Sequence, residues 1–477
     1  MYRKDGYVAD TEYTHYFYKE LSPTYIRFAA LVSGYQAPDI SKPFRYIELG
    51  SGQGLTTNIL AATHPMGEFI GIDFNPSQIV KSRDMAERAG LANVSFRLES
   101  FQESAEANDE EIPPADFICL HGIYSWVSYE AREAIFKFIS RKLRAGGIVY
   151  ISYNTMPGWA ELHPIRQFLY EYANLSVGSS NKRVEEAYIK INYMMNKDSF
   201  LNKNNSFNKS VRRMLEHPYN YISHEYFNDN WNIVYVTDMR RFFSDINLQP
   251  IGPAEPLESY NDLYMSEEAL SILSEFEGHE LYEFVKDLAC NQWFRQDLFG
   301  YGTRRLSSPQ RAEGYRNSDF TPILDYKEKN YQFNTYQGKT SLRKGDYESI
   351  VTKIHEKATF TPVLLEENFK LHLDKAVKLL SGLLASGNIH LETPVVGAEI
   401  AHKLNKIIID RVSNGEPYQY IAAPKIGTAI PISGFDHEAL NVLLYDPNGK
   451  YDGNNEYANQ ELSGKKQAWR RLGIIKK

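Results

Sequence analysis

The feature that most constrains this chain is an apolar run that ends in an acid and continues into alternating glycines, Tyr46-Ile47-Glu48-Leu49-Gly50-Ser51-Gly52-Gln53-Gly54. The apolar run is typical of a β-strand, the glycines of a tight turn, and the periodic segment 55–62 of a helix. Because glycine has no Cβ, a ligand can approach the backbone N–H groups at the start of such a helix. The stretch therefore predicts a strand, a ligand-binding loop and a helix.

A second acid narrows the choice of ligand. The apolar segment 69–73 ends in Asp73, where the ribose-binding acid of a Rossmann unit is expected. The glycine spacing differs from the pyrophosphate fingerprint, and Glu48 would repel a phosphate. A ligand with an adenosine end and a cationic amino-acid end suits this loop, which predicts S-adenosyl-L-methionine as the cofactor and S-adenosyl-L-homocysteine as the product. The alternative for Asp73 is a cap on the helix that follows Asn75 and Pro76.

Further strands are predicted at residues 93–101, 116–122 and 147–153, and helical segments separate them. Strands and helices that alternate at this spacing predict an α/β fold with a parallel sheet, whose ligand lies at the carboxyl ends of the strands. Polar residues or glycines stand at each of these ends. We therefore expect a Rossmann-like catalytic domain that binds the cofactor at residues 36–160.

Composition and charge limit the partners. The 477 residues suffice for two to four domains, and 53 basic against 60 acidic residues give a net charge of −7 without long runs of one sign. This pattern favours neither nucleic acid nor an anionic membrane. Cys119 and Cys290 are too few and too far apart for a disulfide framework, and no apolar segment has the length of a membrane span, so we expect a cytoplasmic protein.

The sequence lacks the motifs of DNA and RNA base methylation and of metal binding. No Asn-Pro-Pro-Tyr or Asp-Pro-Pro-Tyr follows the fourth strand, which argues against methylation of an exocyclic base nitrogen. Cys119 lies inside a strand rather than at a loop, where an attacking thiolate would be needed. No His or Cys spacing indicates a metal site. Nucleic acid is therefore an unlikely substrate, and no metal is expected.

Aromatic residues are abundant, with 34 tyrosines in the chain, and many precede the glycine-rich loop. Residues 1–35 are predicted to form an N-terminal aromatic cap that includes Tyr16. One interpretation is that these rings cover the sheet by ordinary packing. The other is a lid whose rings contact the sulfonium of the cofactor and the methyl acceptor through cation–π attraction.

The remaining chain is predicted to form two more domains. Residues 161–303 have mostly helical periodicity and form a helical regulatory or lid domain, with an exposed loop around residues 197–209. Residues 304–477 form an α+β, winged-helix-like domain, because three helices are followed by the short strand 389–391. Its third helix is mostly apolar, which favours contact with another protein, or with a second copy of the chain as a homodimer, over DNA binding.

These motifs resemble a known family. The segments Glu48–Gly54 and Gly71–Pro76 look like the first two motifs of class I S-adenosylmethionine-dependent methyltransferases. The segments Tyr13–Thr14, Leu120–Val127 and Ile151–Trp159 more narrowly resemble bacterial methyltransferases with a methyltransferase regulatory domain. That group includes rickettsial protein-lysine methyltransferases that modify an outer-membrane protein. Further similar segments are His217–Trp231 and Asn291–Gln296, and the resemblance is thin after about residue 300.

The resemblance implies roles for the matching positions. Glu48, Gly50 and Gly52 face the methionine end of the cofactor, and Asp73, followed by Phe74, takes the ribose hydroxyls. Ser100 and Phe101 border the adenine, although many relatives have an aspartate in place of Ser100. His121 and Gly122 lie beside the methionine carboxylate or sulfonium, unless His121 is only a hydrogen-bonded core residue. The predicted acceptor-side, catalytic residues are Tyr16, Trp126, Asn154 and Trp159.

The sequence thus predicts a methyltransferase that modifies a protein side chain, with the lysine Nε as the expected acceptor. For lysine, aromatic walls would remove water from the amine and supply its neutral, nucleophilic form. Two alternatives stay open: a small-molecule O- or N-methyltransferase, and a non-catalytic scaffold that binds the cofactor.

Overall fold

The computed structural model describes residues 3–4, 7–8, 16–197, 203, 205–216, 222, 225–323, 330–335, 338–341, 344–446 and 465–476. Side chains of residues 1–15 lie outside this description, so the part of the predicted aromatic cap that includes Tyr13 is not placed. His217 and His224, from one of the family-like segments, also lie outside it. Within the described part, no helix combines the length and the apolar character that a membrane span requires.

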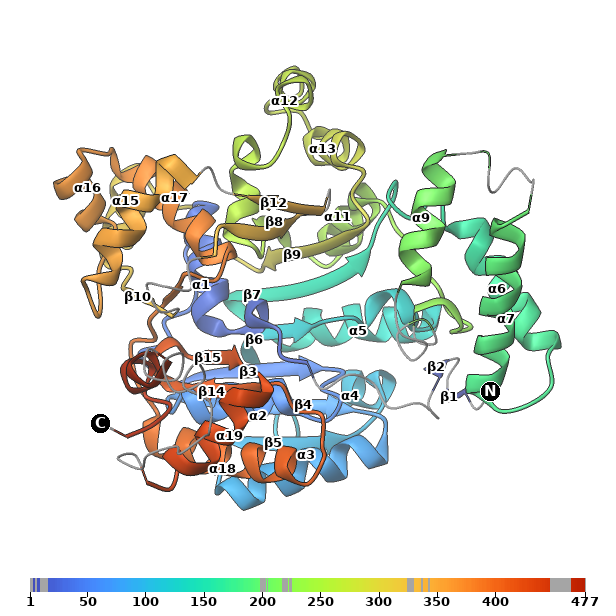
Figure 1. Ribbon diagram of the computed structural model, residues 1–477, viewed down its shortest axis with the longest axis horizontal. Helices are drawn as coiled ribbons and strands as arrows, with labels where there is room; N and C mark the ends of the chain where they lie inside the picture. The colour runs from blue at the N-terminus through green and yellow to red at the C-terminus, as the bar shows by residue number, and fades with distance from the viewer. Residues whose placement is uncertain are drawn as a thin grey trace.

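The centre of the molecule is a seven-stranded sheet (Figure 1). Its strands are β3 (Phe44–Leu49), β4 (Gly67–Asp73), β5 (Val94–Leu98), β6 (Ala115–Leu120), β7 (Leu143–Asn154), β8 (Gln249–Pro253) and β9 (Phe294–Gly300). The spatial order is β5-β4-β3-β6-β7-β9-β8. The first five strands of this order are parallel, and β9 runs antiparallel to both of its neighbours. The parallel α/β sheet predicted from the sequence is confirmed.

Helices cover both faces of this sheet, because neighbouring residues on a strand point to opposite faces. Tyr46 packs in one core with α1 (Pro23–Val32), α2 (Leu55–Thr63) and α3 (Pro76–Ala89). Ile47, the next residue, packs in a second core on the other face. The helices of that face are α4 (Phe101–Glu106), α5 (Tyr129–Lys142) and α11 (Val236–Asp245).

Two strands of the sheet come from the stretch that was predicted to be a helical domain. β8 and β9 lie within residues 161–303, but β9 pairs with β7 and β8 pairs with β9, so the catalytic sheet does not end at residue 160. β8 contains Pro250 and Pro253, which a sheet accepts at its edge, where β8 lies. β9 carries the charged residues Arg295 and Asp297, so its sequence does not have the pattern of a buried strand. In the structure these two side chains are buried as an ion pair. Between these strands lie α12 (Glu267–Ser274) and α13 (Tyr282–Cys290).

A helical module projects from the carboxyl end of β7. It contains α6 (His163–Leu175), α7 (Ser180–Met195) and α9 (Asn205–Leu215), which share a core of their own. The exposed loop predicted around residues 197–209 is therefore wrong from Asn205 onward. Val211 and Met214 of α9 are buried in the module, and this packing outweighs the polar composition of the preceding residues.

The chain after β9 begins with α14 (Ser308–Arg316), β10 (Phe320–Pro322) and the hairpin of β11 (Gln332–Thr335) and β12 (Gly338–Ser341). The three predicted helices follow as α15 (Lys344–His355), α16 (Val363–Phe369) and α17 (Leu373–Ala385). The predicted strand is β13 (Ile389–Leu391), which pairs antiparallel with β10. The order of three helices and a strand is confirmed.

Residues 304–477 nevertheless do not form one unit. The segment from residue 398 to residue 476 contains α18 (Ala398–Ser413), β14 (Tyr420–Ala423), β15 (Thr428–Pro431) and α19 (Gly434–Leu443). It shares its core with α2 and α3 of the catalytic sheet, whereas α15 to α17 belong to another core (Figure 1). Arg411 of α18 pairs with Asp84 of α3. We call residues 398–446 and 465–476 the C-terminal cover.

Candidate functional site

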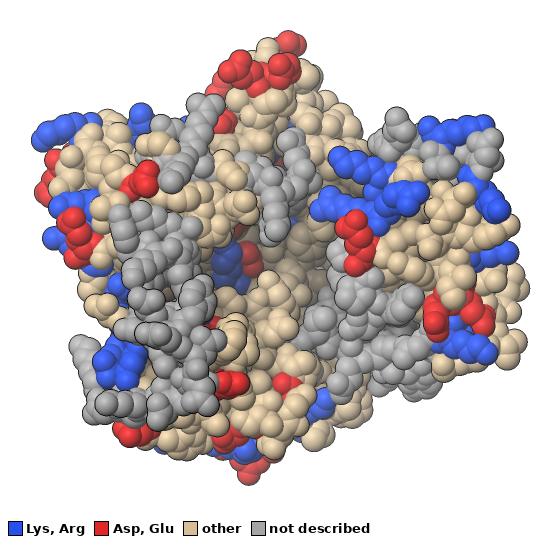
Figure 2. All heavy atoms as spheres, in the orientation of Figure 1, with Lys and Arg blue, Asp and Glu red and all other residues tan. Residues whose placement is uncertain are grey.

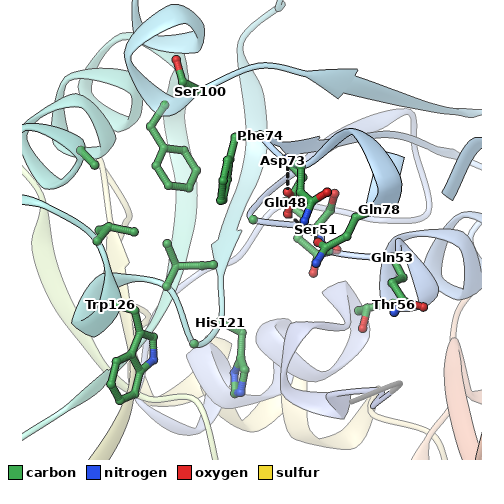
Figure 3. A pocket seen from close by; sticks show the side chains of 18 of the residues that line it. Glu48, Ser51, Gln53, Thr56, Asp73, Phe74, Gln78, Ser100, His121 and Trp126 are labelled. Atoms are coloured by element: carbon green, nitrogen blue, oxygen red, sulfur yellow. Dashed lines mark hydrogen bonds between the residues drawn. The ribbon is translucent and has the colours of Figure 1, made fainter. Parts of the chain in front are cut away.

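A cavity of about 430 Å³ lies at the carboxyl ends of β3, β4, β5 and β6, and its volume falls in the usual range of small-molecule sites, roughly 300 to 1,000 Å³ (Figure 3). The loops after these strands line it, together with Tyr16 and Tyr18 from the N-terminal segment. Every predicted cofactor-binding residue lines this cavity: Glu48, Gly50, Gly52, Asp73, Phe74, Ser100, Phe101, His121 and Gly122.

The glycine-rich loop needs its glycines because of backbone geometry and close packing. Gly50, Gly52 and Gly54 have φ angles of 75°, 54° and 70°, which disfavour residues with a side chain. A Cβ on Gly50 would lie 2.2 Å from Cδ1 of Ile123, and one on Gly54 would lie 2.8 Å from the Phe96 ring. At Gly52 the nearest atom would be 3.5 Å away, an ordinary contact, so only the backbone angle requires glycine there.

Asp73 holds this loop against the end of β4. One carboxylate oxygen accepts a hydrogen bond of 2.9 Å from the Gly52 N–H, and the other accepts one of 2.8 Å from the Asn75 N–H. Asn75, and not Asp73, is the N-cap of α3, because its side chain accepts from the Ser77 N–H. The buried Asp73 carboxylate therefore fixes the loop and lines the cavity, and the alternative of a simple helix cap is wrong.

Glu48 brings a second buried carboxyl group to the cavity. Thr57 donates a hydrogen bond to its Oε2, and burial raises the pKa of Glu48 to about 8. A cation beside this group would favour its ionised form. The neighbouring Ser51 Oγ and Gln53 Oε1 are buried and have no hydrogen-bond partner among the described residues. A buried carboxyl group and unsatisfied polar atoms fit the polar, cationic amino-acid end of S-adenosylmethionine.

The opposite wall of the cavity is aromatic near β5. Phe74 and Phe101 line it and offer apolar surface to a flat base. Ser100 also lines the cavity, but its hydroxyl is engaged in the capping box of α4, in which it donates to Glu103 Oε2 over 2.9 Å and accepts from the Glu103 N–H. Figure 3 shows this hydroxyl turned away from the cavity, so it does not take the place of the aspartate that many relatives have.

His121 stands at the end of β6 in contact with several rings. Its Nδ1 lies 2.7 Å from the Tyr150 hydroxyl, and its ring lies 3.6 Å from that of Tyr18, centroid to centroid, at an angle of 31°. Burial lowers the pKa of His121 to about 3, so the imidazole is neutral at ordinary pH. Gly122 donates its N–H to Ser152 Oγ over 2.8 Å. His121 is thus a hydrogen-bonded residue, as the alternative held, and it also lines the cavity.

Comparison with known proteins agrees with this geometry. A family model described as a methyltransferase domain matches residues 40–219, and one described as a predicted methyltransferase regulatory domain matches residues 218–300. An uncharacterized protein of Synechocystis sp., sll1526, is 30% identical over 457 residues, which cover 94% of this chain and 89% of that protein. The chain belongs to the S-adenosylmethionine-dependent methyltransferases with a methyltransferase regulatory domain.

The fold of this methyltransferase also occurs among solved structures. PKMT2 from Rickettsia typhi, in complex with AdoHcy, aligns with a TM-score of 0.70 at 17% sequence identity and covers 97% of this chain and 99% of that one. The uncharacterized protein RP789 of Rickettsia prowazekii is 25% identical over 307 residues, 60% of this chain and 54% of that protein. The shared fold extends over nearly the whole methyltransferase.

The regulatory domain of the methyltransferase is not separate from the catalytic sheet. The match at residues 218–300 includes α11, β8, α12, α13 and β9, and both strands are part of the central sheet. Arg295 of β9 is buried with the carboxylates of Asp287 and Asp297, at 2.5 and 2.8 Å, and binds Glu283 at 2.9 Å. This charged cluster ties α13 to the sheet.

Two of the four predicted acceptor-side residues line the cavity of the methyltransferase. Tyr16 is 47% exposed, and its ring packs edge-on against Tyr420 of the C-terminal cover, with 4.9 Å between ring centroids. Trp126 lies in a short 3₁₀ helix, Tyr124–Trp126, across the cavity from Gln53 and Thr56 (Figure 3).

The predictions that placed Asn154 and Trp159 at the crevice are wrong for this cavity, which neither residue lines. Asn154 is the last residue of β7 and is 4% exposed. The Trp159 ring is buried in the helical module, where its Nε1 donates to the Trp293 carbonyl over 2.7 Å and its ring contacts Trp231. The chain leaves the sheet after β7 and carries Trp159 into another core.

Sequence reasoning missed several polar residues of the site. Ser51, Gln53 and Thr56 belong to the glycine-rich loop and the first turn of α2, and Gln78 belongs to the first turn of α3. Their signal is positional, because the first helical turn after each strand faces the ligand crevice in this fold. Tyr18 had no comparable signal among the tyrosines that precede the loop.

Proposed function

We propose that this methyltransferase transfers the methyl group to a protein side chain, and that the acceptor is the Nε of lysine. The observation that carries the proposal is the aromatic mouth of the cofactor cavity, formed by Tyr16, Tyr18 and Trp126, with Tyr16 nearly half exposed. Figure 2 shows the surface hollowed near the centre of this face, between the helical module and the strands. The resemblance to rickettsial protein-lysine methyltransferases and the shared fold of PKMT2 support the same acceptor.

The cofactor residues take distinct roles in this proposal. Asp73 lines the cavity with a buried carboxylate and accepts hydrogen bonds from the ribose hydroxyls, because each carboxylate oxygen can accept more than one hydrogen bond. Glu48 faces the cofactor ammonium, and this cation favours ionisation of a carboxyl group whose pKa burial has raised. Phe74 and Phe101 border the adenine.

The aromatic mouth then acts on the lysine. When bound, S-adenosylmethionine supplies an electrophilic methyl group on a sulfonium and leaves as S-adenosylhomocysteine. A lysine side chain is apolar along its stem, so the rings of Tyr16, Tyr18 and Trp126 can pack along it and exclude water. Removal of water disfavours the charged ammonium and lowers its pKa, which supplies the neutral amine that can react. Ring faces also attract a cation before it loses its proton.

The test is transfer of label from methyl-labelled S-adenosylmethionine into a lysate of cells that lack this protein. We expect label in a discrete protein band and, after acid hydrolysis, in methylated lysine. Asp73→Asn, which weakens the cofactor site, should lose the label, whereas Asp245→Asn, the same change at the exposed end of α11, should keep it. Label in an extractable small molecule would instead support the small-molecule methyltransferase, and cofactor binding without transfer to any acceptor would support the scaffold.

Two further predictions concern the setting of the enzyme. Both cysteines, Cys119 and Cys290, are free and buried. We infer from their free thiols a reducing, cytoplasmic compartment. A homodimer stays a prediction, and sedimentation of the purified chain over a range of concentrations tests it.

A further inference from the structure

His121 is held by side chains from three different parts of the chain. Tyr18 comes from the N-terminal segment and lies against the imidazole face. Tyr150 of β7 bonds to Nδ1 at 2.7 Å. Phe294 of β9 approaches with its ring edge, with 5.9 Å between centroids. A ring confined in this way has one orientation. What can still differ is its tautomer, that is, which of its two nitrogens carries the proton.

The Tyr150 hydroxyl determines the position of that proton. Gln296 of β9 donates its Nε2–H to the Tyr150 oxygen over 2.9 Å. A phenolic hydroxyl has a single proton to donate, and with Gln296 as donor to its oxygen, that proton is directed to His121 Nδ1. Nδ1 is then an acceptor, so in the neutral imidazole the proton resides on Nε2.

Nε2 is the nitrogen that remains for a ligand. The structure gives it no hydrogen-bond partner among the described residues, and His121 lines the cofactor cavity. Because burial keeps the pKa of His121 near 3, the imidazole neither carries a charge at ordinary pH nor readily accepts a proton from an acceptor amine. An N–H group is suited to a carboxylate, and the amino-acid end of the cofactor has one.

We propose that Gln296 and Tyr150 are positioning residues that fix His121 as its Nε2–H tautomer, so that His121 serves as a hydrogen-bond donor to the cofactor carboxylate and not as a general base. The hydrogen-bond chain Gln296–Tyr150–His121 also gives the regulatory domain a direct role in the site. Gln296 and Phe294 both lie in the matched segment 218–300, so a displacement of β9 changes the imidazole that faces the cofactor.

The direct test is a long-range ¹H–¹⁵N correlation spectrum of the full-length protein labelled in its histidine rings. The chain has 12 histidines, so a His121→Gln variant identifies the ring signals of His121. In the wild type we expect an unprotonated Nδ1 and a protonated Nε2. Gln296→Glu reverses the direction of both hydrogen bonds. The new carboxylate accepts the Tyr150 proton, and the phenolic oxygen then accepts a hydrogen bond from Nδ1–H of His121. In that variant we expect the opposite tautomer.

Function provides a second readout. In Gln296→Glu, loss of the donor to the carboxylate should raise the Kd of S-adenosylhomocysteine about tenfold in calorimetric titration. Tyr150→Phe only removes the partner of Nδ1, so it should give a mixture of the two tautomers and a smaller increase in Kd. Tyr46→Phe is the matched control, because Tyr46 is equally buried in the sheet and makes no hydrogen bond to His121 or Gln296. Its tautomer signals and Kd should equal those of the wild type.

Three outcomes would overturn the proposal. The first is a protonated Nδ1 in the wild type, and the second is an unchanged tautomer in Gln296→Glu. The third is a Kd in Gln296→Glu that matches the Tyr46→Phe control. If Gln296→Glu does not fold, Gln296→Met, which removes the donor at a half-buried site, replaces it and should give a mixture of the two tautomers. None of these measurements depends on the methyl acceptor, so they stand apart from the test of lysine methylation.

Discussion

Replacement of Asp73 by asparagine tests whether one carboxylate both fixes the loop and binds the cofactor. Both of its oxygens accept backbone hydrogen bonds, from Gly52 at 2.9 Å and from Asn75 at 2.8 Å. An amide has only one oxygen, so its NH₂ group must face one of these two N–H donors. The variant thus loses a charged acceptor for the ribose and one anchor of the loop.

The expected magnitude follows from the bonds that are lost. A hydrogen bond to a charged group contributes about 1.5 to 3 kcal/mol, so the affinity for S-adenosylmethionine should fall by roughly 10- to 150-fold. Calorimetric titration of S-adenosylmethionine measures this effect. Asp245→Asn is the control, because it removes the same charge from an exposed side chain at the end of α11, outside the cavity. If Asp73→Asn folds and binds within about twofold of the wild type, the role assigned to Asp73 is wrong.

Three further outcomes are expected. Gly50→Ala should lower the melting temperature and abolish cofactor binding, because its Cβ would overlap Ile123. Gly122→Ala has a φ of 64° and no atom within 4 Å of its Cβ, so it should cost only the backbone strain of about 1 to 2 kcal/mol. Thermal denaturation and cofactor titration compare the two variants. Burial raises the pKa of Glu48 in the folded state to about 8. The protonated carboxyl group therefore contributes its full stability below the ordinary pKa of 4.5, and this contribution is lost as the pH rises toward 8. Glu48→Gln, which never ionises, should therefore raise the melting temperature of the cofactor-free protein more near pH 9 than near pH 4, and an equal change at both would contradict this. Arg295→Met should destabilise the fold by about 3 to 5 kcal/mol in urea denaturation, because it leaves buried carboxylates without their cation, and a loss below about 1 kcal/mol would show that the cluster does not anchor the sheet.

The sequence predicts the cofactor half of the site well, because strand ends and glycines are local signals. Asp73 is the last residue of its apolar strand, Gly50 and His121 directly follow theirs, and parallel strands bring their carboxyl ends to one edge. The positions of the strands were therefore enough to predict that these residues line one cavity. The role of Asp73 in holding Gly52 could not be predicted, since it depends on distances between two loops.

The acceptor half and the outer strands depend on contacts between distant parts of the chain. Trp159 lies five residues beyond the end of β7 at Asn154, and its ring packs with Trp231 and Trp293, which no local pattern indicates. β9 appeared polar because Arg295, Gln296 and Asp297 are consecutive, and burial of Arg295 becomes favourable only with the carboxylates that it pairs with. Periodicity cannot distinguish such a strand from a loop.

Because the C-terminal cover is synthesised late, it determines when the enzyme can become active. Tyr16 at the cavity mouth packs on Tyr420, and α2 and α3 are covered by α18, so the first and last parts of the chain form one core. A ribosome that adds 5 to 20 residues per second needs roughly 20 to 70 s to proceed from α3 to α19. During that interval the glycine-rich loop exists without its covering layer. The nascent chain therefore exposes apolar surface and lacks a finished cofactor site until the C-terminal cover has been synthesised.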